Sequence, residues 1–396
     1  MSELSALIAD RIRTNGPISL AEFISLSLYH PTYGYYARAS CRTGRAGDFF
    51  TSVDVGPVFG ELLTRQLAEM WTVLRSRQSP TPDRQAPFFD LVEAGAGSGR
   101  LARDVLDAAA RHHPEFYQHT RLHLIEVAPT ARAAQVETLG PHASKLVRSS
   151  DSLSSAPIDG VILANELLDA LPTHAVVMRK DGLREVFVDF KSTGGSNVQF
   201  VECERAPSTP ELERYLAAVG ARLEAGWRTE INLEAPVWIR EAARTLRRGF
   251  LMLMDYGHDA WELYSASHSA GTLTTFQRHT SEDPLLPLQD PGEHDITAHV
   301  DLTTVTRAAE SAGLVTLGRL DQTYFLLGLG LAEMLDARPF DAAQGRPFDA
   351  TAWKRRLALK TLMLPGGLGS TLKVLIFGKD VGTPKLKGLS YKVRLT

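Results

Sequence analysis

The sequence predicts an α/β fold: a mostly parallel sheet of about seven strands, with an N-terminal helical region before it and an inserted substrate-side subdomain within it. From residue 88 onward, short apolar runs with strand character alternate with amphipathic helical segments, a pattern typical of parallel sheets with helical crossovers. A glycine-rich turn joins the first strand to its helix, and acidic side chains follow three of the strands. Because the carboxyl ends of parallel strands meet at one edge, we expect these groups to share a ligand site there.

Length, composition and charge limit the class of protein. The chain has 396 residues, of which 44% are hydrophobic and 22% charged, which suits a core with large additions or two intimate domains. A net charge of -3 gives no electrostatic footprint for nucleic acid, and no apolar run reaches the ~20 residues that a membrane span needs. The chain has two cysteines, Cys41 and Cys203, and an N-terminus without a signal-type apolar core. We therefore expect a protein of a reducing compartment, the cytoplasm.

Residues 1–85 are expected to form helices and a lid loop. Apolar residues recur at helical spacing from Leu4 to Ile12, a capping box at Ser19 to Glu22 opens a second helix, and a third runs from about Pro57 to Arg77. The loop before the third helix is unusually long, and it is too aromatic for disorder. We interpret it as a lid; the alternative is a surface connection packed by its own aromatic side chains. The lid candidates are Tyr33, Gly34, Tyr36, Gly47, Asp48, Phe49, Thr51 and Ser52.

The turn after the first strand carries glycine at alternate positions behind an acid: Glu93, Gly95, Gly97 and Gly99. Gly95 permits a sharp turn, Gly97 lacks the Cβ that would block a ligand, and Gly99 lets the helix start close to the strand. A dinucleotide site needs a further glycine at the sixth position, where Arg100 stands, and an acid does not attract a pyrophosphate. The methionine end of S-adenosyl-L-methionine (SAM) carries an ammonium and a sulfonium, so the turn favours SAM. The alternative is a glycine-rich turn without a ligand.

Residues 86–171 make up the first half of the expected SAM-binding core. Its strands are expected near 91–92, 122–126, 145–148 and 160–164. Glu126 ends the second strand, where an acid can accept hydrogen bonds from both ribose hydroxyls of an adenosine cofactor. Asp151, just past the third strand, is a candidate for contact with the adenine amino group. The alternative for Glu126 is a surface acid at a strand end.

The regular alternation of strand and helix stops at residue 172. Two short strand-like runs flank Asp181-Gly182, a strong hairpin turn, and helices are expected near 210–224 and 236–248, the latter with Gly249 as C-cap. We take 172–248 as an insertion that covers the active edge of the sheet. Residues 249–396 return to the core, with strands expected near 250–254, 314–320 and 372–377. A hexamer that starts at residue 337 recurs eight residues on, which indicates a surface-loop insertion at about 337–350.

The segment from Asn165 to Pro172, after the fourth strand, carries the most informative chemistry. Glu166 and Asp169 are three residues apart, so in a helical turn both carboxylates point to one side. Such a pair can hold a guanidinium, help to localise its charge and accept the released proton. The alternative is that both acids cap the turn or face solvent. His174 and His258 are conceivable bases that we do not assign, and no Cys/His spacing predicts a metal site.

Short motifs follow one another along nearly the whole chain. They are Tyr29-His30-Pro31 with Tyr33-Gly34-Tyr35-Tyr36, Gly47-Asp48-Phe49 with Thr51-Ser52, Phe59-Gly60-Glu61, Glu93 to Gly99, Ala164-Asn165-Glu166 with Asp169 to Pro172, Asp255-Tyr256-Gly257, and Thr297 to Asp301. In this order they resemble the MidA-like protein arginine methyltransferases, whose mitochondrial members assist assembly of respiratory complex I. The chain departs from that family at Val53, Asp54, Ala96, Leu167 and Leu168, which affects the expected substrate geometry more than SAM binding.

The resemblance implies the seven-stranded SAM-methyltransferase (Rossmann-like) sheet with an added helical region. We expect a SAM-dependent methyltransferase that acts on arginine in a protein partner, with a respiratory complex I subunit as a candidate partner. The alternatives are a SAM-binding assembly chaperone without turnover, or a methyltransferase acting on a small molecule or another residue. The candidate catalytic residues are Glu166, Asp169 and Asn165; the candidate cofactor contacts are Glu93, Gly95, Gly97, Gly99, Glu126, Asp151, Asp48, Thr51 and Ser52; the candidate substrate or lid residues are Tyr33, Gly34, Tyr36, Phe49 and Tyr256.

Overall fold

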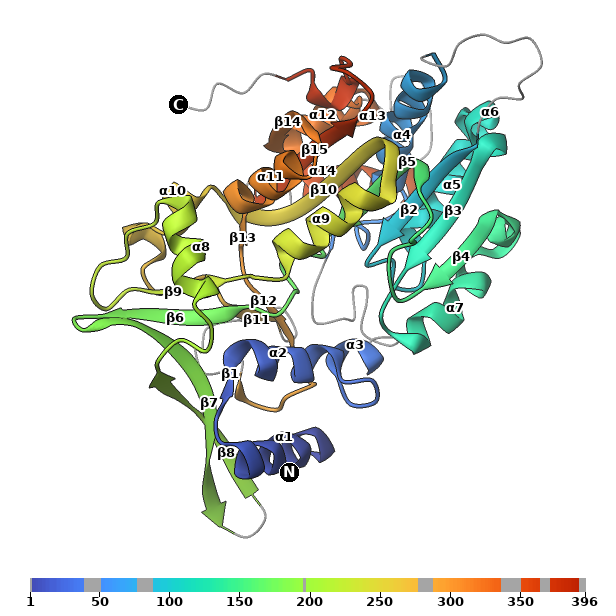
Figure 1. The fold of residues 1–396 in the computed structure, drawn as a ribbon. Coiled ribbons are helices and arrows are strands. Elements are labelled where there is room, and N and C mark those ends of the chain that lie inside the picture. Colours follow the sequence, from blue (N-terminus) through green and yellow to red (C-terminus); the bar gives the residue numbers. More distant parts are fainter. Residues whose placement is uncertain are drawn as a thin grey trace.

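The computed structural model describes residues 2–38, 51–76, 88–194, 197–276, 288–335, 350–363 and 371–391. Its centre is a sheet in the order β14-β15-β10-β5-β2-β3-β4 (Figure 1). The strands are β2 (Phe89–Ala94), β3 (Thr120–Ile125), β4 (Leu146–Ser150), β5 (Ile158–Asn165), β10 (Leu246–His258), β14 (Val315–Asp321) and β15 (Leu372–Lys379). Neighbours are parallel except around β15, which is antiparallel to β10 and β14. The predicted α/β fold is confirmed, and the strands lie where the alternation places them.

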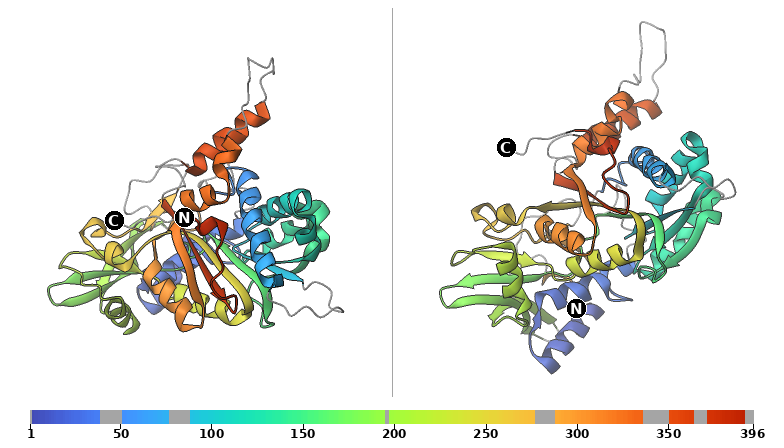
Figure 2. Two further views of the ribbon diagram at one scale, coloured as in Figure 1. Left: turned by 90° about the horizontal axis from the view of Figure 1, so that it is seen from above. Right: turned by 45° about the horizontal axis from the view of Figure 1, so that its top comes forward.

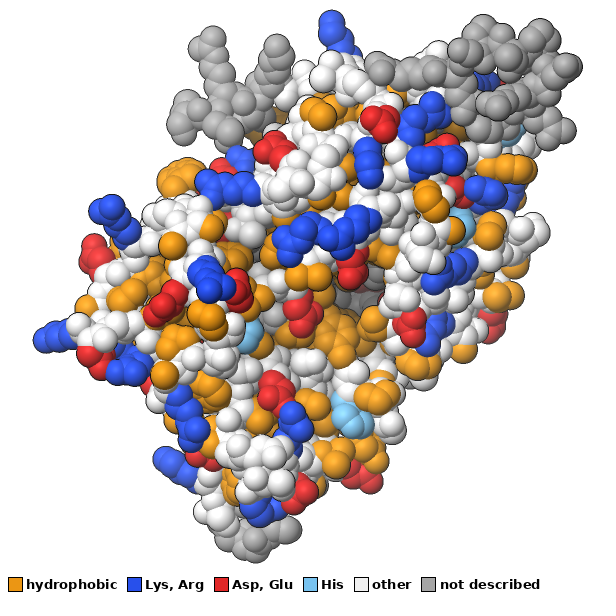
Figure 3. Space-filling view, viewed as in Figure 1, with side chains coloured by type: hydrophobic (Ala, Val, Ile, Leu, Met, Phe, Trp, Pro, Cys, Tyr) orange, Lys and Arg blue, Asp and Glu red, His pale blue; other side chains and the backbone are white. Residues whose placement is uncertain are grey.

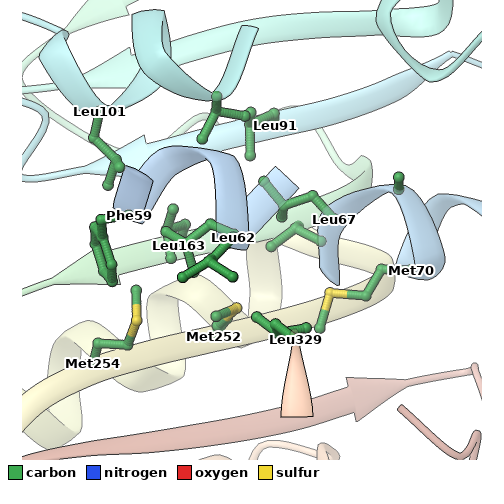
Figure 4. Close-up of a cluster of buried hydrophobic side chains, with 14 of the residues drawn as sticks. Phe59, Leu62, Leu67, Met70, Leu91, Leu101, Leu163, Met252, Met254 and Leu329 are labelled. Atoms are coloured by element: carbon green, nitrogen blue, oxygen red, sulfur yellow. The ribbon is translucent and has the colours of Figure 1, made fainter. Parts of the chain in front are cut away.

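Helices cover both faces of this sheet, which explains the nearly continuous apolar character of its strands. On one face pack α4 (Val58–Ser76) and α5 (Arg100–His112); on the other pack α9 (Ala235–Thr245) and α11 (Leu302–Ser311). Figure 4 shows side chains of α4 lying against Leu163 and Met252 of the sheet. Burying one such side chain stabilises the fold by about 1.5–3 kcal/mol relative to leaving it exposed.

A second, mostly antiparallel sheet lies beside the first, in the order β1-β7-β6-β9 with β8 on the far side of β7 (Figures 1 and 2). Its strands are β1 (Ile18–Ser19), β6 (His174–Arg179), β7 (Gly182–Gly194), β8 (Asn197–Arg205) and β9 (Arg228–Ile231). The hairpin predicted around Asp181-Gly182 is present as β6 and β7, which pair antiparallel. Two helices pack on this sheet through one apolar cluster, α1 (Glu3–Asn15) and α2 (Leu20–Tyr29).

The structure divides the chain differently from the expected segments at two points. The N-terminal helices α1 and α2 pack with the inserted strands, so residues 2–29 and the 174–205 region share one core. Helix α9, expected within the 172–248 insertion, packs on the main sheet through Ile239 and its neighbours as the crossover into β10. Gly249 is therefore not a C-cap: it lies inside β10, where a Cβ would come 1.9 Å from the carbonyl oxygen of Gly160.

The remaining α-helices and strands complete the fold. They are α3 (Tyr35–Arg38), α6 (Pro114–His119), α7 (Pro129–Leu139), α8 (Glu211–Val219), α10 (Ala260–Leu263), β11 (Thr274–Phe276), β12 (Asp295–Thr297), β13 (Val300–Asp301), α12 (Gln322–Gly328), α13 (Leu331–Leu335) and α14 (Ala350–Met363). Among the described helices, none has both the length and the apolar character to cross a membrane. The lid candidates Gly47, Asp48 and Phe49, and the duplicated hexamers up to residue 349, lie outside the described residues.

Candidate active site

A cavity of about 270 Å³ opens at the carboxyl ends of β2, β3 and β5. Four segments line most of it: the glycine turn after β2, Glu126 with the start of α7, the turn after β5, and the stretch from Thr51 to Asp54. Side chains of α3 and β12 complete the wall. Figure 3 shows a hollow near the middle of this face of the molecule, with hydrophobic and acidic side chains around it. The cavity thus lies at the sheet edge that the sequence predicts.

The glycine turn brings backbone to the cavity wall. Gly95, Gly97 and Gly99 have φ values of 72°, 50° and 85°, a left-handed region that side chains disfavour. The N–H groups of Gly95 and Ala96 donate to the Ile125 carbonyl at 3.0 Å each, which fixes the turn to β3. A Cβ on Gly97 would meet nothing within 4 Å, because that side of the residue faces the open cavity. The space that a side chain would fill is the space that a ligand needs.

Glu126 is held at the cavity rim by backbone groups. Its Oε2 accepts from the N–H of Gly97 at 2.8 Å, and its Oε1 accepts from the N–H of Ala128 at 2.8 Å. An ionised carboxylate has about four lone-pair sites, so both oxygens keep capacity for a further donor. A ligand with two neighbouring hydroxyls, such as a ribose, suits this acid.

Glu93 at the end of β2 is an acid without a full set of partners. Its side chain is buried, and its Oε2 has no hydrogen-bond partner among the described residues. Burial raises the pKa of Glu93 to about 8, an effect only partly offset by a hydrogen bond from the backbone of Ala102. A cation with N–H donors, such as the ammonium of SAM, would satisfy this carboxylate. Together with the open face of Gly97, it shows that the residues present fit SAM.

The turn after β5 is not helical, contrary to the expectation for Asn165 to Pro172. Glu166 has a φ of 51°, and its N–H donates to the Met254 carbonyl at 2.8 Å. The next two N–H groups donate to the Asp255 carboxylate, at 3.2 Å from Leu167 and 2.7 Å from Leu168. A carboxylate from β10 thus caps these two N–H groups, and the positive φ of Glu166 keeps the turn from forming a regular helix. Glu166 and Asp169 still line the same cavity, as predicted.

Glu166 and Asp169 are acids with unsatisfied oxygens. Glu166 Oε1 accepts from Asn165 Nδ2 at 3.0 Å and from the Ser52 N–H at 3.4 Å. Its Oε2, and Oδ1 of the buried Asp169, have no hydrogen-bond partner in the described part of the chain. Burial raises the pKa of Glu166 to about 8, and burial together with the nearby Asp255 raises the pKa of Asp169 well above its usual range. Asp255 is itself buried, which raises its pKa to about 7.

The described part of the expected lid is tied to the site. Asp54 forms an ion pair with Arg100 at 2.7 Å, and its side chain is almost fully buried. Ser52 is buried, and its hydroxyl contacts the Gln322 amide at 3.1–3.2 Å. Tyr36 donates its hydroxyl to Asp295 Oδ1 at 2.9 Å, across the cavity wall. The first two contacts join the stretch before α4 to α5 and α12, and the third joins α3 to β12.

Some predicted residues lie outside the cavity lining. Asp151 is exposed, and its Oδ1 accepts from the Ser152 hydroxyl. Tyr33 stacks on His30 with ring centroids 5.2 Å apart, and the adjacent Gly34 packs against the backbone of that same residue. Tyr256 lies close enough to the acids for their charges to raise the pKa of its hydroxyl, after burial as the main cause, but it does not line the cavity.

Other site residues were not predicted from the sequence. Arg100, Asp54 and Asp295 line the cavity, and Asp255 holds the turn after β5. Asp255 follows the buried run of β10, so the rule that singled out Glu93 and Glu126 could have found it. Asp295 lies on the three-residue strand β12, where no sequence signal marks a strand end.

Three comparisons relate the chain to known proteins. The family model described as S-adenosyl-L-methionine-dependent methyltransferase matches residues 62–320. The "Protein arginine methyltransferase NDUFAF7 homolog, mitochondrial" of Drosophila melanogaster is 31% identical over 82% of this chain and 74% of its own length. Its Mus musculus relative is 30% identical over 81% and 72%. A Burkholderia thailandensis protein, crystallised with S-adenosyl-homocysteine, aligns with a TM-score of 0.83 at 28% identity, over 99% of this chain and 95% of its own.

These relatives correct one expectation. The NDUFAF7 relatives are named as mitochondrial proteins. The expectation of a cytoplasmic location conflicts with that finding and is wrong. The reason is physical: a low cysteine count fits any compartment that keeps thiols reduced, so composition does not separate one from another.

Proposed function

The chain belongs to the family of S-adenosyl-L-methionine-dependent methyltransferases, and we propose that it transfers a methyl group to an arginine side chain of a partner protein. One observation carries the choice of acceptor. Glu166 Oε2 and Asp169 Oδ1 are buried at the same cavity without a hydrogen-bond partner among the described residues. A cation with several N–H donors would satisfy two buried acids that lack hydrogen-bond partners. A guanidinium has five N–H donors in a fixed plane.

The cofactor half of the site holds and orients SAM. Glu126 would accept from the ribose hydroxyls and Glu93 would pair with the ammonium of the methionine end, with Gly97 leaving the room between them. When bound, SAM supplies an electrophilic methyl group on its sulfonium. The apolar side chains that line the cavity beside these acids, such as Leu101 and Ala128, exclude water from the acceptor.

The acceptor half prepares the nucleophile. Glu166 and Asp169 accept hydrogen bonds from the guanidinium, which hold it in place and draw its charge toward the bonded nitrogens. A third nitrogen is left to attack the methyl group. As that nitrogen gains the methyl group, the guanidinium as a whole must lose one proton, and Glu166 would accept it, for which its raised pKa suits it. Asn165 keeps Glu166 oriented through the hydrogen bond at 3.0 Å.

The partner is a protein, since the acceptor is one of its side chains. The relatives are named as protein arginine methyltransferases, which supports this class of acceptor. A subunit of respiratory complex I is the candidate that the resemblance implies.

The test is mass spectrometry of purified complex I subunits incubated with the chain and SAM. The expected result is the mass of one or two methyl groups on an arginine, absent when SAM is omitted and absent when that arginine is replaced by lysine. Methylation of another residue type would sink the assignment of the acceptor. SAM binding by calorimetry without transfer to any subunit would favour the chaperone instead.

A further inference from the structure

Three histidines far apart in the sequence meet beside the active site. His258 is the last residue of β10, His268 ends the single turn η3 (Ala266–His268), and His299 lies between β12 and β13. One ring nitrogen from each lies within 4.8 Å of the other two. The ring centroids are 4.6 Å, 5.0 Å and 6.3 Å apart. Three imidazoles therefore converge on one point from three separate segments.

Two of the rings are oriented by one residue, Glu262. His268 Nδ1 lies 3.0 Å from the backbone carbonyl of Glu262, and because a carbonyl can only accept, this nitrogen carries the proton. His258 Nδ1 lies 3.2 Å from the Glu262 carboxylate. Both contacts leave the Nε2 lone pairs free in the neutral rings. Metal-binding histidines show this arrangement, in which the second nitrogen donates to a carboxylate or a backbone carbonyl.

The third ring lacks such a partner. Nδ1 of His299 is buried and has no hydrogen-bond partner within the described residues. A buried polar nitrogen without a partner has a cost of roughly 1–3 kcal/mol, which a bound ion would remove.

We propose that His258, His268 and His299 bind one Zn²⁺ ion. Three imidazoles with partial solvent access match the ligand set that zinc takes, with a fourth position left for water or a carboxylate. Tetrahedral coordination at Zn–N of about 2.0–2.1 Å sets the nitrogens about 3.3 Å apart, so the rings close slightly around the ion. The all-nitrogen set disfavours Mg²⁺ and Ca²⁺, which prefer oxygen ligands.

The bound ion would have a structural role next to the active-site cavity. His258 follows Asp255 by three residues on β10, and His299 follows Asp295 and Thr297, two residues of the cavity wall. A bound ion would add to the β10–β13 pairing that already joins these two segments. The zinc site does not depend on the identity of the methyl acceptor.

The test is calorimetric titration of ZnCl₂ into the full chain after removal of metal by a chelator, with metal content checked by mass spectrometry. The expected result is one Zn²⁺ per chain. His268→Ala and His299→Ala are each expected to weaken binding at least 100-fold. Glu262→Gln, which removes only the orienting carboxylate, is expected to weaken it about 10–100-fold. His112→Ala, on the exposed end of α5, is the control and should bind as the parent does.

A second readout separates lost ligation from misfolding. Each variant is checked by circular dichroism and SAM binding, and Co²⁺ replaces Zn²⁺ to report its ligands by visible absorption. Intense tetrahedral bands in the parent, lost in a folded His268→Ala, support the site. The proposal is overturned if the parent binds no stoichiometric Zn²⁺, or if the folded variants bind it as tightly as the parent.

Discussion

Glu126 on the cofactor side of the cavity and the two acids on its acceptor side are the same kind of residue but are left in opposite states. On the cofactor side, both oxygens of Glu126 accept from backbone N–H groups at 2.8 Å. On the acceptor side, Glu166 Oε2 and Asp169 Oδ1 are buried with no hydrogen-bond partner among the described residues. Glu126 is thus already hydrogen-bonded in the empty protein, whereas the acceptor-side acids, like Glu93 on the cofactor side, gain a full set of partners only when a cation arrives.

The acceptor half has a cost in the empty protein. Buried acids beside each other hold their protons, and the pKa of Glu166 rises to about 8 mainly through burial. Glu166 also has a positive φ of 51°, a strain of roughly 1–3 kcal/mol for a residue with a side chain. The strain persists because Met254 and Asp255 hold the backbone on both sides of the residue. We infer that this destabilisation is retained because the unpaired acids make the site selective for a cationic acceptor.

Glu166→Gln gives the largest expected effect, a loss of kcat, because it removes a carboxylate of the acceptor half and leaves the cofactor half unchanged. An amide neither ionises nor accepts a proton, so kcat should fall about 1,000-fold, within the range of 100- to 10,000-fold that such groups contribute. The dissociation constant for SAM should stay within about threefold, since the contacts of Glu126 are untouched. Steady-state kinetics and calorimetry measure the two values.

Glu137→Gln is the matched control for that variant. Glu137 is exposed on α7, so the same chemical change should leave both values as in the parent. If Glu166→Gln kept its kcat, Glu166 would have no role in the transfer.

Gly97→Ala breaks the cofactor half. The added methyl occupies cavity space at a φ of 50°, and overpacking costs of 1–3 kcal/mol predict SAM binding weaker by about 10- to 100-fold. Gly140→Ala is the control, since Gly140 has a φ of 52° and open space around it but lies outside the cavity. Equal losses of SAM affinity in both variants would mean that backbone strain, not a blocked site, is the cause.

The pH dependence of kcat/KM for the protein substrate is a further test of the acceptor half. The pKa of Glu166 is raised to about 8, so at pH 7 in the free enzyme this acid is mostly protonated and cannot grip a guanidinium. At saturating SAM, kcat/KM for the protein substrate should therefore rise about tenfold per pH unit up to about pH 8 and then level off. A flat profile between pH 6 and 8 in the parent would contradict the role of the ionised acid.

The residues of the cofactor half could be predicted from the sequence because each of them lies next to a strand with a clear apolar pattern. Gly97 and the acid that its N–H contacts, Glu126, each follow a strand whose apolar pattern is plain, so strand ends could be located and joined at one edge. The positions of the strands along the chain and the hairpin at Asp181-Gly182 follow from the same local signals. Alternation and turn chemistry determine these features within a few residues.

The other features of the fold and the site depend on contacts between residues far apart in the sequence, which no local pattern indicates. The turn at Glu166 was expected to be helical, but Glu166 has a φ of 51°, and the turn is held by Met254 and by Asp255, 89 residues further on. Packing of α9 on the main sheet, rather than in the insertion, depends on which apolar face finds a partner. The histidines at 258, 268 and 299 have no regular spacing, so only the fold brings them together.

Arg100→Gln gives the smallest expected effect, because it loosens the wall of the cofactor half without removing a proposed SAM contact. It leaves the buried Asp54 without its ion-pair partner, so the stretch from Thr51 to Asp54 should close less firmly over SAM. Since Arg100 is about a third exposed, the loss is below that of a fully buried pair, and KM for SAM should rise about three- to tenfold with kcat nearly unchanged. Arg247→Gln is the control, because the exposed Arg247 pairs with Asp159 far from the cavity and such pairs contribute about 0–1 kcal/mol. A fall in kcat instead of a rise in KM would assign Arg100 and its segment to the acceptor half, and the division of the cavity into two halves would then need to be redrawn.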